Sequence, residues 1–588
     1  MLFGKSINRY YLKYLYLFLL GLVALITIDY AQLEIPKLYR YLINGINTGF
    51  VEIGGETLPF NFDFVLDHVC QPMMLIILSL VIGRFVWRIC FFGAGIKLET
   101  SLRLRLFDHC KDLSQNYYQV NKVGNLMSLF TNDLDTVQEA FSWGAMMFAD
   151  AVFLGGLSII RMIQVNGFLT LFALIPMAFM LIISLIVSKY MMTKWDKRQA
   201  AFSSLSDFSQ ESFSGIAVIK AFVKEAKELW AFKKLNVENE DANVDYTKSS
   251  TLLRICVTLF VESVVCVILG YGGYLVWRET LDVGQLMEFI GYFTSIVWPI
   301  MAISELIDIT SRGKASLKRI DELLKAEQDV FDREDATEIA SVNGKIQFKN
   351  LTFQHNLGEY DALKNVSFTV NAGENVGIIG RTGAGKTTLV DLILRNYNVP
   401  DGTLFIDDRD VNSITIRSLR DHIAYVPQDN FLFSDTITNN IAFASDNNDF
   451  ESVKHAAELA EVSDNIEEFT EKYETVLGER GVTVSGGQKQ RISIARALMK
   501  KAPILILDDS LSAVDTKTEK NLLQNLQKER GGKTTILIAH RISTIEQMDK
   551  IIYIDDGNII AVGTHEELLN TCPSYEAMAE LQKLEAEK

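Results

Sequence analysis

The strongest constraint on the fold of this chain is a set of long apolar runs in its first half. Each run is about 20 residues or longer, which is the length that a helix needs to cross the hydrocarbon core of a bilayer. A helix in a soluble core is usually much shorter. The sequence therefore predicts six membrane-spanning helices, at Leu15–Leu38, Pro72–Gly95, Trp143–Val165, Leu169–Met191, Leu253–Trp277 and Gly284–Leu306.

The charged residues between these runs predict the orientation of the helices. With an even number of spans, both ends of this half lie on the same side of the membrane. Lys and Arg cluster at the N-terminus and in the long connections after the second and fourth runs, whereas residues 44–67 contain acidic residues but no Lys or Arg. Because basic loops stay in the cytoplasm, both termini are predicted to be cytoplasmic.

Two acidic residues lie near the middle of these runs, Asp150 in the third and Glu262 in the fifth. A charge at that depth needs a partner or water. Two interpretations stay open for each residue: it lines a polar cavity through which a substrate passes, or it forms a structural pair. A lining acid would favour cationic substrates.

A glycine-rich run in the second half has the spacing of a phosphate-binding loop, with an apolar strand before it and a helix after it. Its glycines allow backbone N–H groups to turn toward a polyphosphate, Lys386 can reach the β- and γ-phosphates, and the Thr387 hydroxyl can bind magnesium. The run predicts a site for a nucleoside triphosphate with Mg²⁺, built from Gly380, Arg381, Thr382, Gly383, Ala384, Gly385, Lys386, Thr387 and Thr388.

A second strand supplies the acids that such a site needs. Residues 504–507 are continuously apolar and are followed by Asp508 and Asp509. A buried parallel strand that ends in an acid beside a phosphate loop is an arrangement that positions magnesium. We expect Asp508 to lie on the metal side and Asp509 to orient the attacking water. A helix cap or a turn is the alternative for this pair.

A glycine-rich turn that enters a helix at residues 484–491 predicts a second anion site. Its residues Ser485, Gly486, Gly487 and Gln488 resemble the signature motif of the ATP-binding cassette (ABC) transporters, and the resemblance covers essentially the whole chain. In that family, the signature of one subunit closes over the ATP that the phosphate loop of another subunit holds. The resemblance therefore implies a second half-transporter as partner, within the lipid bilayer.

The resemblance also assigns roles to three other residues. Gln428 resembles the glutamine that contacts magnesium, His540 the switch histidine near the γ-phosphate, and Asp515 the aspartate of the loop that reaches across the dimer. Six spans followed by one cassette resemble an exporter-type half-transporter, which implies an ATPase coupled to transport across the bacterial cytoplasmic membrane.

Composition divides the chain into domains. Its 588 residues are too many for one core, and the long apolar runs end near residue 310, where the sequence becomes charged and acidic. We predict a helical transmembrane domain at residues 1–325, a linker at 326–340 and an α/β nucleotide-binding domain at 341–588. The net charge of −16 argues against a nucleic-acid partner, and the six cysteines contain no CxxC pair that would suggest zinc.

Two positions depart from the family pattern. The family usually has a catalytic glutamate after the magnesium-binding aspartate, and this chain has Asp509, which is one methylene shorter. A displacement of about 1 Å can cost on the order of a hundredfold in rate, so this site is expected to hydrolyse ATP slowly. The family usually stacks a tyrosine on the adenine, and His355, at that position, offers a smaller ring.

A slow site combined with an intact signature favours a heterodimer whose other chain carries the glutamate. In this respect the chain resembles the BmrC-type subunit of asymmetric bacterial multidrug exporters, which implies small-molecule substrates such as drugs or other hydrophobic or amphipathic compounds. Two alternatives stay open. One is a homodimer that exports lipids or peptides, and the other is a regulatory membrane subunit that binds ATP without transport.

Overall fold

The computed structural model describes residues 5–355, 358–445, 449–478, 481 and 483–586, although it does not describe the side chains of residues 5–6, 180–186, 188–189, 304 and 585–586. The chain forms two compact units. The first contains Met1–Cys110 and Gly124–Lys325, and the second contains Lys111–Val123 and Ala326–Lys588.

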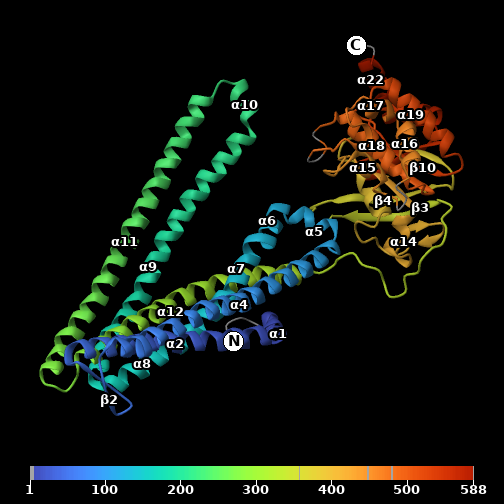
Figure 1. Ribbon diagram of the computed structural model, residues 1–588. Coiled ribbons are helices and arrows are strands. Elements are labelled where there is room, and N and C mark those ends of the chain that lie inside the picture. The colour runs from blue at the N-terminus through green and yellow to red at the C-terminus, as the bar shows by residue number, and fades with distance from the viewer. Residues whose placement is uncertain (1–4, 356–357, 446–448, 479–480, 482, 587–588) are drawn as a thin grey trace. The chain divides into compact units, whose positions relative to one another are not determined.

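Long helices make up most of the first unit (Figure 1). The three longest continuous ones have 48, 53 and 42 residues, and at about 1.5 Å per residue each is much longer than a bilayer is thick. The helices of this unit are α1 (Lys5–Lys13), α2 (Leu15–Thr48), α3 (Phe62–Val65), α4 (Gln71–Lys111), α6 (Val123–Ser128), α7 (Leu134–Glu139), α8 (Ala145–Val165), α9 (Gly167–Ser214), α10 (Ile216–Ala221), α11 (Glu225–Trp277) and α12 (Val283–Leu324). A short hairpin of β1 (Phe50–Ile53) and β2 (Glu56–Pro59) follows α2.

Five of the helical stretches among the described residues are long and apolar enough to cross a membrane: Leu15–Thr48, Phe62–Lys111, Val123–Val165, Glu225–Trp277 and Val283–Leu324. The predicted count was six. The remaining predicted span, Leu169–Met191, lies within α9, where Gly167–Phe179 forms a shorter apolar stretch. Part of that span lies outside the residues whose side chains the structure describes.

Two kinds of packing organise the first unit. The helices α9 and α11 run side by side and are joined by α10 (Figure 1). The helices α2, α8 and α12 pack together around a core that includes Leu33, Leu154 and Phe289. Small residues allow this close approach. A Cβ atom on Gly291 of α12 would lie 2.7 Å from Pro36 of α2, so any larger side chain at this position would push the two helices apart.

The second unit contains two sheets. The larger one has the strand order β12-β11-β5-β10-β9-β8. In it β5, β8, β9, β10 and β11 run parallel to one another, and β12 pairs with β11 in the antiparallel direction. Buried on both faces, these strands are almost continuously apolar, as a parallel sheet requires. Their bounds are β5 (Asn375–Ile379), β8 (Ile423–Val426), β9 (Ile504–Asp508), β10 (Thr534–Ile538), β11 (Lys550–Asp555) and β12 (Asn558–Gly563).

The smaller sheet is antiparallel, with the order β4-β3-β6-β7. Its strands are β3 (Ile346–Gln354), β4 (Asp361–Val370), β6 (Leu404–Ile406) and β7 (Arg409–Asp410). The helices of the unit are α5 (Gln115–Val120), α13 (Lys386–Ile393), α14 (Ile416–Asp421), α15 (Ile437–Ala442), α16 (Phe450–Leu459), α17 (Ser463–Glu467), α18 (Gly486–Met499), α19 (Thr516–Glu529), α20 (Ile542–Ile545), α21 (His565–Thr571) and α22 (Pro573–Ala586).

The helix α5 belongs to this second unit although it precedes most of the membrane half in sequence. Its Gln119 Nε2 donates a hydrogen bond of 2.8 Å to the hydroxyl of Tyr397. The side chain of Asn116 donates another, of 3.2 Å, to Asp329. These two bonds attach α5 to the part of the unit that contains the phosphate loop.

Candidate active site

The carboxyl ends of β5, β9 and β10 open onto one pocket of about 290 Å³. These strands are adjacent and parallel, so the loops that follow them meet at the same edge of the sheet. The pocket contains most of the residues predicted to handle a nucleotide. It is lined by His355, Ala362, Thr382, Gly383, Gly385, Lys386, Thr387, Thr388, Gln428, Asp508, Asp509, Ile538 and His540.

The phosphate loop connects β5 to α13. Gly385 precedes α13 with a φ of 99°, in the left-handed region that favours glycine. A Cβ atom on Gly380 would lie 2.0 Å from the carbonyl oxygen of Ile554, so only glycine fits there. The loop can therefore approach a polyphosphate with its backbone, at the N-terminus of a helix.

Lys386 is buried and points back into this loop. Its Nζ donates hydrogen bonds of 2.9 and 3.0 Å to the carbonyl oxygens of Gly380 and Arg381. Burial lowers the pKa of Lys386, and the nearby carboxylates of Asp509 and Asp508 oppose that shift. An ammonium group held in this way is placed to form charge-assisted hydrogen bonds with phosphate oxygens.

Asp508 and Thr387 form the side of the pocket that fits a magnesium ion. The Thr387 hydroxyl donates a hydrogen bond of 3.4 Å to Asp508 Oδ1. Asp508 is 1% exposed, and its Oδ2 accepts no hydrogen bond from any residue that the structure describes. Burial, with smaller contributions from Asp391 and Asp509, raises the pKa of Asp508 to about 6. A buried, unpaired carboxylate oxygen beside a hydroxyl suits Mg²⁺, which prefers oxygen ligands.

Asp509 and His540 face each other across the pocket, with 4.0 Å between Asp509 Oδ2 and His540 Nε2. Asp509 holds a φ of 46°, and its backbone N–H donates to Ile538 O at 3.0 Å. The left-handed backbone turns the carboxylate away from the path of β9 and into the pocket. A carboxylate at this place can orient a water molecule for in-line attack on a phosphate.

His355 lies at the edge of the same pocket, but other side chains surround its ring. Its Nε2 is 3.3 Å from the Thr388 hydroxyl. The ring makes edge-to-face contacts with Phe353 and Tyr397, with centroid distances of 5.0 Å in both cases. Sequence reasoning missed Tyr397, which supports His355 on one side and accepts the hydrogen bond from α5 on the other.

Asp391 is a second residue that sequence reasoning missed. Its charge contributes to the raised pKa of Asp508, and its own pKa is raised by burial. The sequence signal that could have identified Asp391 is its helical spacing from Thr387. Asp391 follows Thr387 by four residues on α13, so both project from one face of that helix.

The signature residues and Asp515 lie outside the described lining of this pocket. Ser485 caps α18 in a capping box: Gln488 N donates to Ser485 Oγ, and Ser485 N donates to Gln488 Oε1. Asp515 caps α19 in a similar way, by accepting from Thr518 N at 3.1 Å. Gln490 of α18 connects the two segments, because it accepts from Ala513 N and donates to the Ser512 hydroxyl.

The two acids predicted in the membrane half have different surroundings. Asp150 on α8 is 8% exposed and accepts a hydrogen bond of 2.7 Å from the indole N–H of Trp298 on α12. Asp29 of α2 lies beside it. Glu262 is exposed on α11. The structure thus gives Asp150 polar partners between packed helices and presents Glu262 at the surface of the chain.

Comparison with known proteins covers both units. Residues 7–300 match the family described as "ABC transporter transmembrane region", and residues 363–512 match that described as "ABC transporter". The solved "Structure of a bacterial Atm1-family ABC exporter with ATP bound" is similar over 98% of this chain and 99% of that one, with a TM-score of 0.78 and 26% identity.

Curated relatives match over nearly the full length. The "Probable multidrug resistance ABC transporter ATP-binding/permease protein YheI" of Bacillus subtilis (strain 168) is 34% identical over 99% of this chain and 97% of its own. The "Multidrug resistance-like ATP-binding protein MdlA" of Escherichia coli (strain K12) is 35% identical over 96% and 94%. The "ATP-dependent lipid A-core flippase" of Syntrophus aciditrophicus (strain SB) is 32% identical over 88% and 87%.

Proposed function

The chain belongs to the ABC transporter family, and we propose that it is the slow-hydrolysing half of a heterodimeric exporter. As a member of this family it is a multi-pass membrane protein with an ATPase domain, and it couples ATP hydrolysis to transport. ABC exporters work as dimers. The observation that carries the proposal is the short carboxylate of Asp509 at the place where the water-orienting acid belongs.

In this proposal the pocket holds ATP firmly. The backbone N–H groups of residues 382–387 and the Lys386 ammonium bind the phosphates. Thr387, Asp508 and Gln428 would hold Mg²⁺, which supplies charge neutralisation between the β- and γ-phosphates when it is bound. His540 would contact the γ-phosphate, and His355 would contact the adenine from the edge of the pocket.

The slow hydrolysis of ATP in this proposal follows from the position of Asp509. Its carboxylate stops 4.0 Å from His540 Nε2, which is beyond hydrogen-bond distance. A water molecule between these groups and the γ-phosphate would be oriented by a base that is about one C–C bond too short. Catalytic groups must lie within fractions of an ångström of their productive positions, so the rate of ATP hydrolysis at this site falls steeply. The binding of ATP is unaffected.

The signature residues complete the other site of the dimer. Ser485–Gln488 form the N-terminus of the 14-residue helix α18, where the helix dipole favours an anion. Their place outside the lining of this chain's own pocket supports a role at the phosphate loop of the partner, together with Asp515. Faster hydrolysis would occur there, on a glutamate that the partner supplies.

The substrates in this proposal are drugs or other hydrophobic and amphipathic compounds. Support comes from the names of two relatives, YheI and MdlA, which refer to multidrug resistance. The lipid A-core flippase among the relatives keeps lipids as the second candidate class. We place the protein in the bacterial cytoplasmic membrane with both termini in the cytoplasm, as the distribution of basic residues favours.

The heterodimer can be tested with two differently tagged copies of the chain. Both copies are expressed together in cells that also contain the other ABC half-transporters found with it in nature. After purification from detergent through the first tag, the heterodimer predicts that the second tag is absent and that one other ABC half-transporter is present in equal amount. Recovery of both tags in one complex would show a homodimer and contradict the proposal. A relative of known homodimeric assembly, tagged in the same way, serves as the control.

The substrate class is tested on the same purified complex in lipid vesicles. Amphipathic dyes should stimulate ATP hydrolysis more strongly than peptides or added lipids. Stimulation by lipids alone would favour the flippase-like alternative, and the absence of any transport with normal ATP binding would favour a regulatory subunit.

A further inference from the structure

The C-terminal helix α22 carries one polar residue on the face that packs against the domain. Tyr575, Met578 and Ala579 of α22 pack into or against the hydrophobic core of the second unit. Gln582 follows at the spacing i, i+3, i+4, i+7, which continues the same face of the helix. An amide at a position that faces the core needs hydrogen-bond partners. The hydrogen-bond partners of Gln582 therefore indicate its role.

Gln582 brackets the backbone of the switch histidine. Its Nε2 donates a hydrogen bond of 2.7 Å to the carbonyl oxygen of His540, and its Oε1 accepts one of 2.8 Å from the N–H of Ile542. One planar amide thus fixes the backbone on both sides of Arg541. The imidazole of His540 extends from this fixed segment to within 4.0 Å of Asp509 in the nucleotide pocket.

The start of α22 is anchored, so Gln582 is projected from a rigid base. Tyr575 is fully buried, and its hydroxyl lies 2.9 Å from His565 Nδ1. Its ring also contacts Tyr553 of β11 edge to face. Because β11 pairs with β5, which leads into the phosphate loop, α22 is fixed to the same sheet that carries the site.

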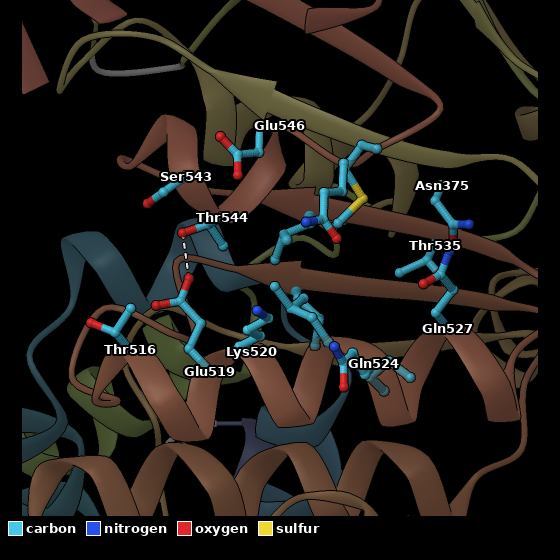
Figure 2. A pocket seen from close by; sticks show the side chains of 16 residues that line it. Asn375, Thr516, Glu519, Lys520, Gln524, Gln527, Thr535, Ser543, Thr544 and Glu546 are labelled. Atoms are coloured by element: carbon cyan, nitrogen blue, oxygen red, sulfur yellow. Dashed lines mark hydrogen bonds between the residues drawn. The ribbon is translucent and has the colours of Figure 1, made fainter. Parts of the chain in front are cut away.

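The segment after His540 has a different anchor. Figure 2 shows the Thr544 side chain pointing toward Glu519 of α19, and the Thr544 hydroxyl donates a hydrogen bond of 2.5 Å to Glu519 Oε1. A pocket of about 250 Å³ lies next to this contact, between α19 and the segment that contains α20. The polar contacts at the two ends of α20 add to the packing of Ile542 and Ile545 in the hydrophobic core of the unit. Glu519 holds the downstream end, and Gln582 holds the upstream end next to His540.

We propose that Gln582 is a positioning residue of the hydrolysis site, which holds His540 in reach of the γ-phosphate through its two backbone hydrogen bonds. The proposal rests on the proposed function, because it takes His540 as the switch histidine of an ABC exporter. Without the amide, the backbone at residues 540–542 has lost both constraints from α22. A shift of about 1 Å there is enough to reduce the rate of hydrolysis by one to two orders of magnitude.

The test compares Gln582→Ala and Gln582→Glu with Lys583→Ala in the full-length chain purified without a partner, so that every hydrolysis site contains the His540 and Asp509 of this chain. Lys583 is the exposed neighbour of Gln582 on α22, so its substitution changes the same helix without touching the switch segment. All three are made both in the natural sequence and on an Asp509→Glu background, where hydrolysis is expected to be faster. The steady-state kcat and the KM for ATP are measured for each.

Gln582→Ala should lower kcat about tenfold with KM within about twofold of the parent, whereas Lys583→Ala should change neither. Gln582→Glu can still accept from Ile542 N but cannot donate to His540 O at neutral pH, so it should be as slow as Gln582→Ala. Hydrogen exchange of the peptide that contains Ile542 should accelerate in Gln582→Ala while exchange in β5 and β9 stays slow.

A kcat for Gln582→Ala within twofold of the parent would overturn the proposal. Equal losses in Gln582→Ala and Lys583→Ala, or full activity of Gln582→Glu, would also overturn it. A failure of the Gln582 proposal can be distinguished from a failure of the proposed function. If Asp509→Glu brings no gain in rate, the slow-site proposal fails, but the comparison of the Gln582 and Lys583 variants is still read in the natural sequence.

Discussion

Replacement of Asp509 by glutamate is the substitution whose effect follows most directly from the geometry of the site. Asp509 Oδ2 lies 4.0 Å from His540 Nε2, whereas a hydrogen bond between such groups spans about 2.7–3.2 Å. One additional C–C bond adds about 1.5 Å of reach. The longer side chain therefore brings its carboxylate into the range where it can orient water beside His540 and the γ-phosphate.

The expected gain is large and is limited by the backbone. A displacement of about 1 Å can cost on the order of a hundredfold in rate, or about 2.7 kcal/mol of activation free energy. Asp509 has a φ of 46°, and glutamate tolerates the left-handed region less well than aspartate. We expect this to cost about 1 kcal/mol in the free energy of unfolding of the cassette. Asp509→Glu should thus hydrolyse up to a hundredfold faster at a slightly lower melting temperature.

Single-turnover hydrolysis by the chain purified without a partner reports on this site alone. The purified chain is mixed in excess over radiolabelled ATP, and the release of phosphate is followed over time in the natural chain, in Asp509→Glu and in Asp509→Asn. The asparagine variant keeps the size of the side chain but has no base, so it should be slower than the natural chain. A gain of less than about threefold for Asp509→Glu, with an intact fold, would refute the argument from side-chain length.

Three other predictions concern binding. Lys386→Ala removes the buried ammonium and should weaken ATP binding by ten- to a hundredfold in a titration with a fluorescent ATP analogue; unchanged affinity would contradict its role. Asp508 has a pKa of about 6 and binds metal only as the carboxylate. Mg²⁺-dependent ATP binding should therefore weaken as the pH falls from about 7.5 to about 5.5. The Asp508→Asn variant should lack this dependence on pH. His355→Ala should weaken nucleotide binding by about threefold to tenfold if the imidazole stacks on adenine, and no change in the titration would exclude that contact.

The helical and sheet elements that bring the site together were predictable because their signals are local. The apolar runs predicted membrane helices, and five of them are recovered among the described residues. The apolar strand before Asp508 and the glycine spacing before Lys386 indicated a parallel sheet with acids and a phosphate loop at its edge. The pocket that contains Lys386, Thr387, Asp508 and His540 agrees with that expectation.

Features that depend on contacts between distant segments were not predictable in this way. Tyr397 supports His355 and accepts a bond from Gln119, yet these three residues lie far apart in the sequence. The Gln582 contact with His540 spans 42 positions and gives no periodic signal except a polar residue on an apolar helix face. Asp150 was recognisable as a buried acid, but its partner Trp298 lies on another helix.

Slow hydrolysis at the Asp509 site can be measured as the turnover of ATP by the chain purified without any partner. The chain alone offers its own phosphate loop and Asp509, and any site that two copies form would contain the short base. We predict turnover at least about tenfold slower than that of the complex with its natural partner, with ATP still bound tightly. Turnover by the lone chain as fast as that of the complex would contradict it.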